Sequence, residues 1–338
     1  MQAVQYGHSK MNYRQPKPES YHAASTVLRV KLSGRLGNNI VQLINSVTIS
    51  HLRGINEILF SFAGWGQTGD NIAAFLTDII RLPSGITIMF TDNHRGLQGY
   101  HAMIDDVHLE GAVCDYLSRS EDRDAVRNDL DYIFKEAFLP AVRLRSQRHG
   151  YMPNIDTRTA LIHLRGEDVF GYGVSDIRHM PINYPQPPLA FYKLTISRII
   201  SQTDFNLVLL YQDMRNPVLS LLGRYLAEKN IPFQAHRLNI FDSVSSILSC
   251  GALVSSRGTF SSAIAMLSGS TKDYYYFREV ELQHMHQLCS PSSRIYLVQD
   301  LKRKYINKGD WYNLECQHKL MLRYPTDYLS MSCLGVDI

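Results

Sequence analysis

The side chains with the clearest chemical potential follow one short apolar stretch. Residues 159–162 (TALI) are apolar and β-prone, which predicts a buried strand, and His163, Arg165, Glu167 and Asp168 come directly after it. Arginine offers a fixed fork of donors that suits phosphate, and His163 would share a strand face with Arg165. Because α/β proteins bind ligands at the carboxyl ends of their strands, the stretch predicts an anion site. An ordinary surface ion pair at a strand end is the alternative.

A second candidate loop lies near the start of the chain. Residues 27–32 (VLRVKL) predict a strand, residues 34–39 (GRLGNN) a glycine turn, and the following residues a helix to about residue 52. Asn38 or Asn39 would cap this helix. A strand, a glycine turn and a helix start present backbone N–H groups to an anion, although the spacing is neither G-x-G-x-x-G nor a Walker loop. A tight turn that uses glycine only for its geometry is the alternative.

The elements that must position these loops alternate between strand and helix. Further strands are predicted at 57–62, 85–90, 206–211, 231–235, 252–255 and 273–277. Helices are predicted at 121–147, 189–200, 217–229, 242–250, with Asp242 as its cap, and 260–267. This alternation predicts an α/β protein with mostly parallel sheets and helices on both faces.

Length and composition predict two domains and an ordinary globular interior. The 338 residues are 45% hydrophobic and 20% charged. We expect a flexible segment at 1–25, one domain at 26–150, a second at 151–280, and a tail at 281–338 that packs back across both. The net charge of +4, with no long basic run, argues against a nucleic-acid partner.

Cysteine usage and hydropathy predict the compartment. The five cysteines are scattered without a C-x-x-C pair, which favours a reducing environment and gives no zinc signature. The polar N-terminus lacks an apolar segment of signal-peptide length, and the sequence holds no apolar run of membrane-spanning length. We therefore expect a cytoplasmic protein, and an exported protein whose signal has been removed is the alternative.

Three strand-end loops resemble the motifs of one enzyme group. GRLGNNIVQL at 34–43, IHLRGEDVF at 162–170 and SSRGTFSSAIAML at 255–267 are similar to three motifs of the α-1,2-fucosyltransferases and protein O-fucosyltransferases, in the same order. Weaker similarity lies at 189–199, 209–214 and 241–256. The resemblance implies a GT-B fold, in which two Rossmann-like domains with parallel sheets face a cleft. It also implies a nucleotide-sugar donor, held mainly by the second domain, and no obligatory metal.

The same resemblance implies positions around the donor. Arg35, Gly37 and Asn38 would lie over the donor's phosphates and sugar. His163 and Arg165 would hold the nucleotide, with Arg165 on the β-phosphate. The other implied donor-binding residues are Asp213, Asp242, Ser256, Thr259 and Phe260. Of these, the two aspartates would contact the base or ribose, and the last two residues would present backbone N–H groups to the pyrophosphate.

Glycosyl transfer requires groups that stabilise the leaving diphosphate and a group that accepts a proton, and these residues can supply both. Breaking a sugar–phosphate bond builds negative charge on the leaving diphosphate, which Arg35, Arg165 and two helix N-termini would stabilise without a metal. Asn38 is a further candidate catalytic residue. An inverting reaction also needs a group that accepts the proton of the acceptor hydroxyl. Glu167 and Asp168 are the nearest carboxylates, and a structural role, such as holding Arg165, is the alternative for either.

Departures from the family motifs concern the donor sugar. Gly166 stands where many α-1,2-fucosyltransferases carry a second arginine, Ser262 and Ala263 replace tryptophans, and Arg257 replaces a small polar residue. These positions surround the implied donor pocket, so another deoxyhexose, a hexose or an acidic sugar is the alternative to fucose.

We therefore expect an inverting, metal-independent glycosyltransferase that uses no cofactor, with GDP-fucose as the favoured co-substrate. Its acceptor would be a glycan or a lipid-linked saccharide, and the latter is compatible with peripheral membrane association. A non-catalytic nucleotide-sugar- or glycan-binding module of the same fold is the alternative function.

Overall fold

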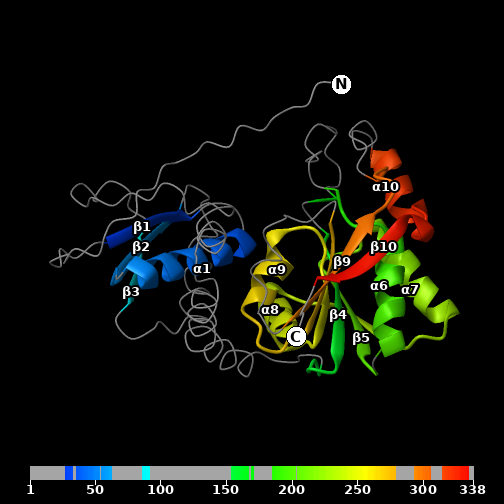
Figure 1. Ribbon diagram of the computed structural model, residues 1–338, viewed down its shortest axis with the longest axis horizontal. Coiled ribbons are helices and arrows are strands. Elements are labelled where there is room, and N and C mark those ends of the chain that lie inside the picture. The colour runs from blue at the N-terminus through cyan, green and yellow to red at the C-terminus, as the bar shows by residue number, and fades with distance from the viewer. Residues whose placement is uncertain are drawn as a thin grey trace.

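The computed structural model describes residues 27–32, 36–53, 55–62, 86–91, 154–166, 169–170, 185–202, 204–278, 293–305 and 314–334. They form two β-sheets with helices packed against them (Figure 1). The predicted helix at 121–147 lies outside them, as do Arg35, Glu167 and Asp168.

The first sheet is parallel and belongs to the N-terminal part of the chain. It has the order β1-β2-β3. Its strands are β1 (Val27–Leu32), β2 (Glu57–Phe62) and β3 (Thr87–Thr91). Helix α1 (Leu36–Arg53) connects the first two strands. The first two strands have the predicted bounds, whereas β3 is shifted by one or two residues from the predicted 85–90. Helix α1 begins at Leu36, so Asn38 and Asn39 lie within its first turn instead of capping it.

The second sheet has seven strands in the order β10-β9-β8-β7-β4-β5-β6. Its strands, in chain order, are β4 (Thr159–Leu164), β5 (Asn206–Tyr211), β6 (Phe233–Arg237), β7 (Ala252–Val254), β8 (Asp273–Phe277), β9 (Arg294–Asp300) and β10 (Leu329–Leu334). All neighbouring pairs are parallel except β9 and β10. The predicted α/β class with mostly parallel sheets is confirmed.

The order of the six parallel strands determines where a ligand fits. From β4 the chain first builds outward through β5 and β6, and then returns to the other side of β4 with β7, β8 and β9. This is the 3-2-1-4-5-6 order of the doubly wound Rossmann fold. In such sheets the ligand crevice lies beyond the carboxyl ends of the two strands where the direction of building reverses. In this chain those strands are β4 and β7.

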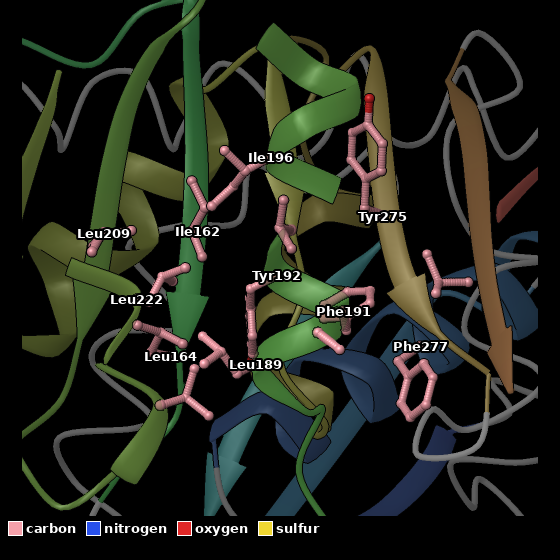
Figure 2. Packing of buried hydrophobic residues seen from close by; sticks show 14 of the residues in the cluster. Ile162, Leu164, Leu189, Phe191, Tyr192, Ile196, Leu209, Leu222, Tyr275 and Phe277 are labelled. Atoms are coloured by element: carbon pink, nitrogen blue, oxygen red, sulfur yellow. The ribbon is translucent and has the colours of Figure 1, made fainter. Parts of the chain in front are cut away.

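Helices cover both faces of this sheet, because its central strands are apolar on both sides. They are α6 (Leu189–Gln202), α7 (Pro217–Glu228), α8 (Ile240–Ser249), α9 (Thr259–Met266) and α10 (Leu314–Arg323). Helices α6 and α7 lie on one side, and α8 and α9 on the other (Figure 1). Figure 2 shows Leu189, Tyr192 and Ile196 of α6 packed over Ile162 and Leu164 of β4.

The two sheets share one apolar cluster. Ile40 and Leu43 of α1 belong to the same buried cluster as Leu28 of β1 and as Ala263 and Ile264 of α9. Helix α9 is short and rich in small side chains, TFSSAIAM, which lets α1 approach it closely. Helix α1 is therefore sandwiched between its own sheet and α9.

The tail after residue 280 contributes to the second sheet. No helix or strand was predicted there from the sequence. Strands β9 and β10 extend the sheet, and helix α10 packs against α6 and α7. Strand β6 also differs from prediction, lying two residues later than 231–235. Within the described residues, no helix is both long and apolar enough to span a membrane.

Candidate functional site

The loops that follow β4 and β7 meet at the predicted crevice. His163, near the end of β4, is 3% exposed, and its Nδ1 lies 2.8 Å from the Ser256 hydroxyl in the loop after β7. The His163 ring also lies 5.8 Å from the ring of Phe260. Burial, with a smaller effect of the Arg165 charge, lowers the pKa of His163 to about 3. The imidazole is therefore neutral at physiological pH and joins the two loops by a hydrogen bond.

Arg165 is half-buried in the loop beyond β4, and hydrogen bonds fix this loop from several sides. The Arg165 Nη1 donates to the Arg257 carbonyl oxygen at 3.3 Å. Its own carbonyl accepts from Asn216 Nδ2 at 2.9 Å, and the next backbone N–H, that of Gly166, donates to Gln212 Oε1 at 2.9 Å. These contacts preorganise a guanidinium at the carboxyl edge of the sheet, as an anion site requires.

Asn216 shows how local sequence and long-range contact combine. The Asn-Pro pair at 216–217 is a helix-start signal, and Asn216 Oδ1 accepts from the Val218 N–H as the N-cap of α7. Its Nδ2 group is then available to hold the Arg165 carbonyl. The helix start was predicted from the sequence, but the contact with the Arg165 carbonyl was not, because it depends on the pairing of β4 with β5.

The space beside Gly166 is occupied by Asp213. A Cβ atom on Gly166 would overlap Asp213 Oδ1. The Asp213 carboxylate accepts from the Arg215 backbone N–H at 2.9 Å and lies 3.3 Å from Arg215 Nε. A side chain at position 166 would require the Asp213 carboxylate to move. Asp213 thus lies beside the Arg165 loop, and its expected contact with a base or ribose stays a prediction.

The starts of α1 and α9 meet at the same edge. Gly258 precedes α9 at φ 135°, a conformation that side chains strongly disfavour, and Thr259 begins the helix. Thr259 Oγ1 donates to Asn38 Oδ1 at 2.5 Å. This bond joins α9, which packs on the second sheet, to α1, which packs on the first. Two helix N-termini, which both favour anions, therefore lie beside the loop that carries Arg165.

Glycine at position 37 permits this close approach. A Cβ atom there would lie 2.5 Å from the Phe260 backbone nitrogen and 2.7 Å from the Thr259 carbonyl carbon. We expect Gly37→Ala to lower the free energy of unfolding by about 1–3 kcal/mol, because backbone atoms must move apart. Urea denaturation followed by circular dichroism measures the change.

Gly223 provides the matched control for that substitution. It lies inside α7, where a Cβ atom would make an ordinary 3.6 Å contact with the Phe233 ring. Gly223→Ala should be neutral or stabilise the protein by up to about 1 kcal/mol, because alanine favours helix more than glycine does. Equal stability of the Gly37→Ala variant and the wild-type protein would contradict the proposed tight packing.

Asp242 lies two strands away from the crevice, in the first turn of α8 beyond β6. The predicted cap is wrong, because Asn239 Oδ1 accepts from the Asp242 N–H at 2.9 Å. In return, the Asp242 carboxylate accepts from Asn239 Nδ2 at 2.6 Å. This reciprocal pair caps the helix from Asn239 and engages the Asp242 side chain locally. A contact of Asp242 with the donor stays a prediction.

The other motif departures belong to the packing of α9. Ser262 and Ala263 are both almost fully buried, and the Ser262 hydroxyl lies 2.8 Å from Tyr274 Oη. Ala263 belongs to the cluster that includes α1. Tryptophan at either position would displace one of these neighbours. Among the described residues, no group of three histidine, cysteine, aspartate or glutamate side chains is placed to hold a metal ion.

Comparison with known proteins gives distant structural similarity only. No family profile and no curated protein sequence matches the chain. The glycosyl transferase family 9 structure from Veillonella parvula is 9% identical with a TM-score of 0.38, over 84% of this chain and 88% of that one. Escherichia coli ADP-heptose LPS heptosyltransferase II is 10% identical with a TM-score of 0.37, over 80% and 89%. Similarity at this level does not assign this chain to their family.

Proposed function

We propose that this protein is a glycosyltransferase that moves a sugar from a nucleotide diphosphate donor to a glycan or saccharide acceptor, by inversion and without a metal. One observation carries the proposal. Arg165, the hydrogen-bonded pair His163 and Ser256, and the N-termini of α1 and α9 converge where the strand order reverses. A diphosphate is the anion that several fixed donors at such an edge suit best.

Preorganisation explains how this site would promote transfer. As the sugar–phosphate bond breaks, negative charge develops on the β-phosphate. The Arg165 loop is already fixed by Asn216 and Gln212, so its guanidinium needs no reorganisation to meet that charge. Backbone N–H groups of Thr259 and Phe260, in the first turn of α9, would add further donors.

The acceptor hydroxyl must lose a proton during transfer. His163 is unsuited to accept it, because its lowered pKa of about 3 makes the imidazole a weak base and Ser256 engages Nδ1. We therefore assign the role of general base to Glu167 or Asp168, which follow Arg165 in the sequence. Direct attack by the acceptor on the sugar would invert its anomeric configuration.

GDP-fucose is the donor that the sequence motifs favour, with Asp213 and Asp242 proposed to contact its ribose or base. Gly166 stands where many of the resembling enzymes carry a second arginine, and Asp213 lies beside it. Another deoxyhexose, a hexose or an acidic sugar therefore stays the alternative on the same diphosphate.

A thermal-shift panel of nucleotides tests the proposed function and identifies the nucleobase of the donor. We expect one of GDP, UDP, dTDP and ADP to stabilise the full-length protein. At a ligand concentration of 100 Kd the gain is about 2.7 kcal/mol, which raises the Tm by several degrees. The matching nucleotide sugar should then release free nucleotide slowly in water. Stabilisation without release would indicate a non-catalytic binding module, and a panel without any stabilisation would refute the proposal.

A further inference from the structure

The hydrogen bond between helices α1 and α9 indicates a role for Thr259 in addition to packing. Thr259 is the first residue of α9 and is 7% exposed, while Asn38 lies half-buried in the first turn of α1. Thr259 Oγ1 donates to Asn38 Oδ1. Gly37 brings the two helix starts close enough for this bond to form. The partners are 221 positions apart in the sequence.

This bond decides which way the Asn38 amide faces. An asparagine side chain carries an acceptor oxygen on one side and an NH₂ group with two donors on the other. Because the Thr259 hydroxyl donates to the oxygen, the NH₂ group is turned away from Thr259. An anion needs donors, and an amide in the opposite orientation would present its carbonyl oxygen instead.

We propose that Thr259 is a positioning residue that orients the Asn38 amide, so that its NH₂ group donates to the diphosphate of the donor. This inference rests on the proposed function, because it assumes that a diphosphate occupies the edge near Arg165. Thr259 acts through Asn38, whereas a purely structural role would only hold α1 against α9.

Inorganic pyrophosphate tests this role without knowledge of the sugar or base. Calorimetry on the full-length protein compares the wild type with Thr259→Val, Thr259→Ser, Asn38→Ala and the double variant Thr259→Val/Asn38→Ala. We expect Thr259→Val and Asn38→Ala each to raise the Kd for pyrophosphate about tenfold, as for the loss of a hydrogen bond to a charged group. Thr259→Ser keeps the hydroxyl and should bind within twofold of the wild type.

The double variant separates positioning from packing. If Thr259 acts through Asn38, the double variant binds pyrophosphate like Asn38→Ala alone. Thr195→Val is the matched control, because Thr195 is a buried threonine on α6 whose hydroxyl donates to the Phe191 and Tyr192 carbonyl oxygens of its own helix. That control should leave the Kd for pyrophosphate unchanged. Wild-type affinity in Thr259→Val, or multiplied losses in the double variant, would overturn the inference.

Asn38→Asp keeps the test decisive if Thr259→Val does not fold. Aspartate still accepts from Thr259, but it presents a carboxylate oxygen in place of the NH₂ group. The Kd for pyrophosphate should then rise more than tenfold, and an unchanged Kd would overturn the inference. The proposed function fails separately, if the wild-type protein does not bind pyrophosphate or if Arg165→Ala does not weaken that binding.

Discussion

Arg165→Ala is expected to lower the rate of nucleotide release from the donor by about 10²–10³-fold, the usual effect of removing one preorganised donor to developing charge. The loop that carries Arg165 is bonded through its backbone to Asn216 and Gln212. Truncation of the side chain should therefore leave the Arg165 loop in place, and it removes the guanidinium together with its hydrogen bond to the Arg257 carbonyl oxygen. Release of the nucleoside diphosphate, measured with a coupled assay, gives the rate.

Two variants sharpen this comparison. Arg165→Lys keeps the charge but loses the planar fork of donors, so its rate should lie between those of the wild type and Arg165→Ala. Arg224→Ala removes an exposed arginine from α7 and should keep the wild-type rate. If Arg165→Ala retains a rate within threefold of the wild type, the guanidinium does not stabilise the leaving diphosphate.

Acid is expected to destabilise the protein through His163. Its pKa is about 3 in the folded protein and near 6.5 in the unfolded chain, so between these values the unfolded chain binds more protons. The neutral ring stabilises the fold fully above pH 6.5, and this contribution is lost as the pH falls toward 3. At pH 4.5 the loss amounts to about 2.7 kcal/mol, from two pH units at 1.36 kcal/mol each.

His163→Gln isolates this contribution, because glutamine does not titrate. Urea denaturation at pH 7 and pH 4.5 gives the change in unfolding free energy for each protein. The change should be smaller in His163→Gln than in the wild type by about 2.7 kcal/mol. His236→Gln on β6 provides the control and should behave like the wild type. An identical change in the wild type and His163→Gln would show that His163 is not buried as a neutral group.

Local patterns in the sequence predicted most of the strands and helices that surround the site. Short apolar runs between turn residues correctly located β1, β2, β5 and β8 to the residue. Their ends showed which side chains would meet at the carboxyl edge. The errors fall where the local signal is weak, as at α8, where Asn239 and Asp242 are both good capping residues.

Taken alone, the sequence determined the α/β class, the alternation of strands and helices, and the loop and helix starts that carry Arg165, Asn38 and Thr259. Such features depend on periodicity and turn chemistry within a few neighbouring residues. Only the tertiary structure decided that β7 lies beside β4, that Ser256 bonds to His163 across 93 positions, and that Asp213 fills the space beside Gly166. Contacts between distant residues depend on strand order and helix packing, which the pattern of any one segment does not encode.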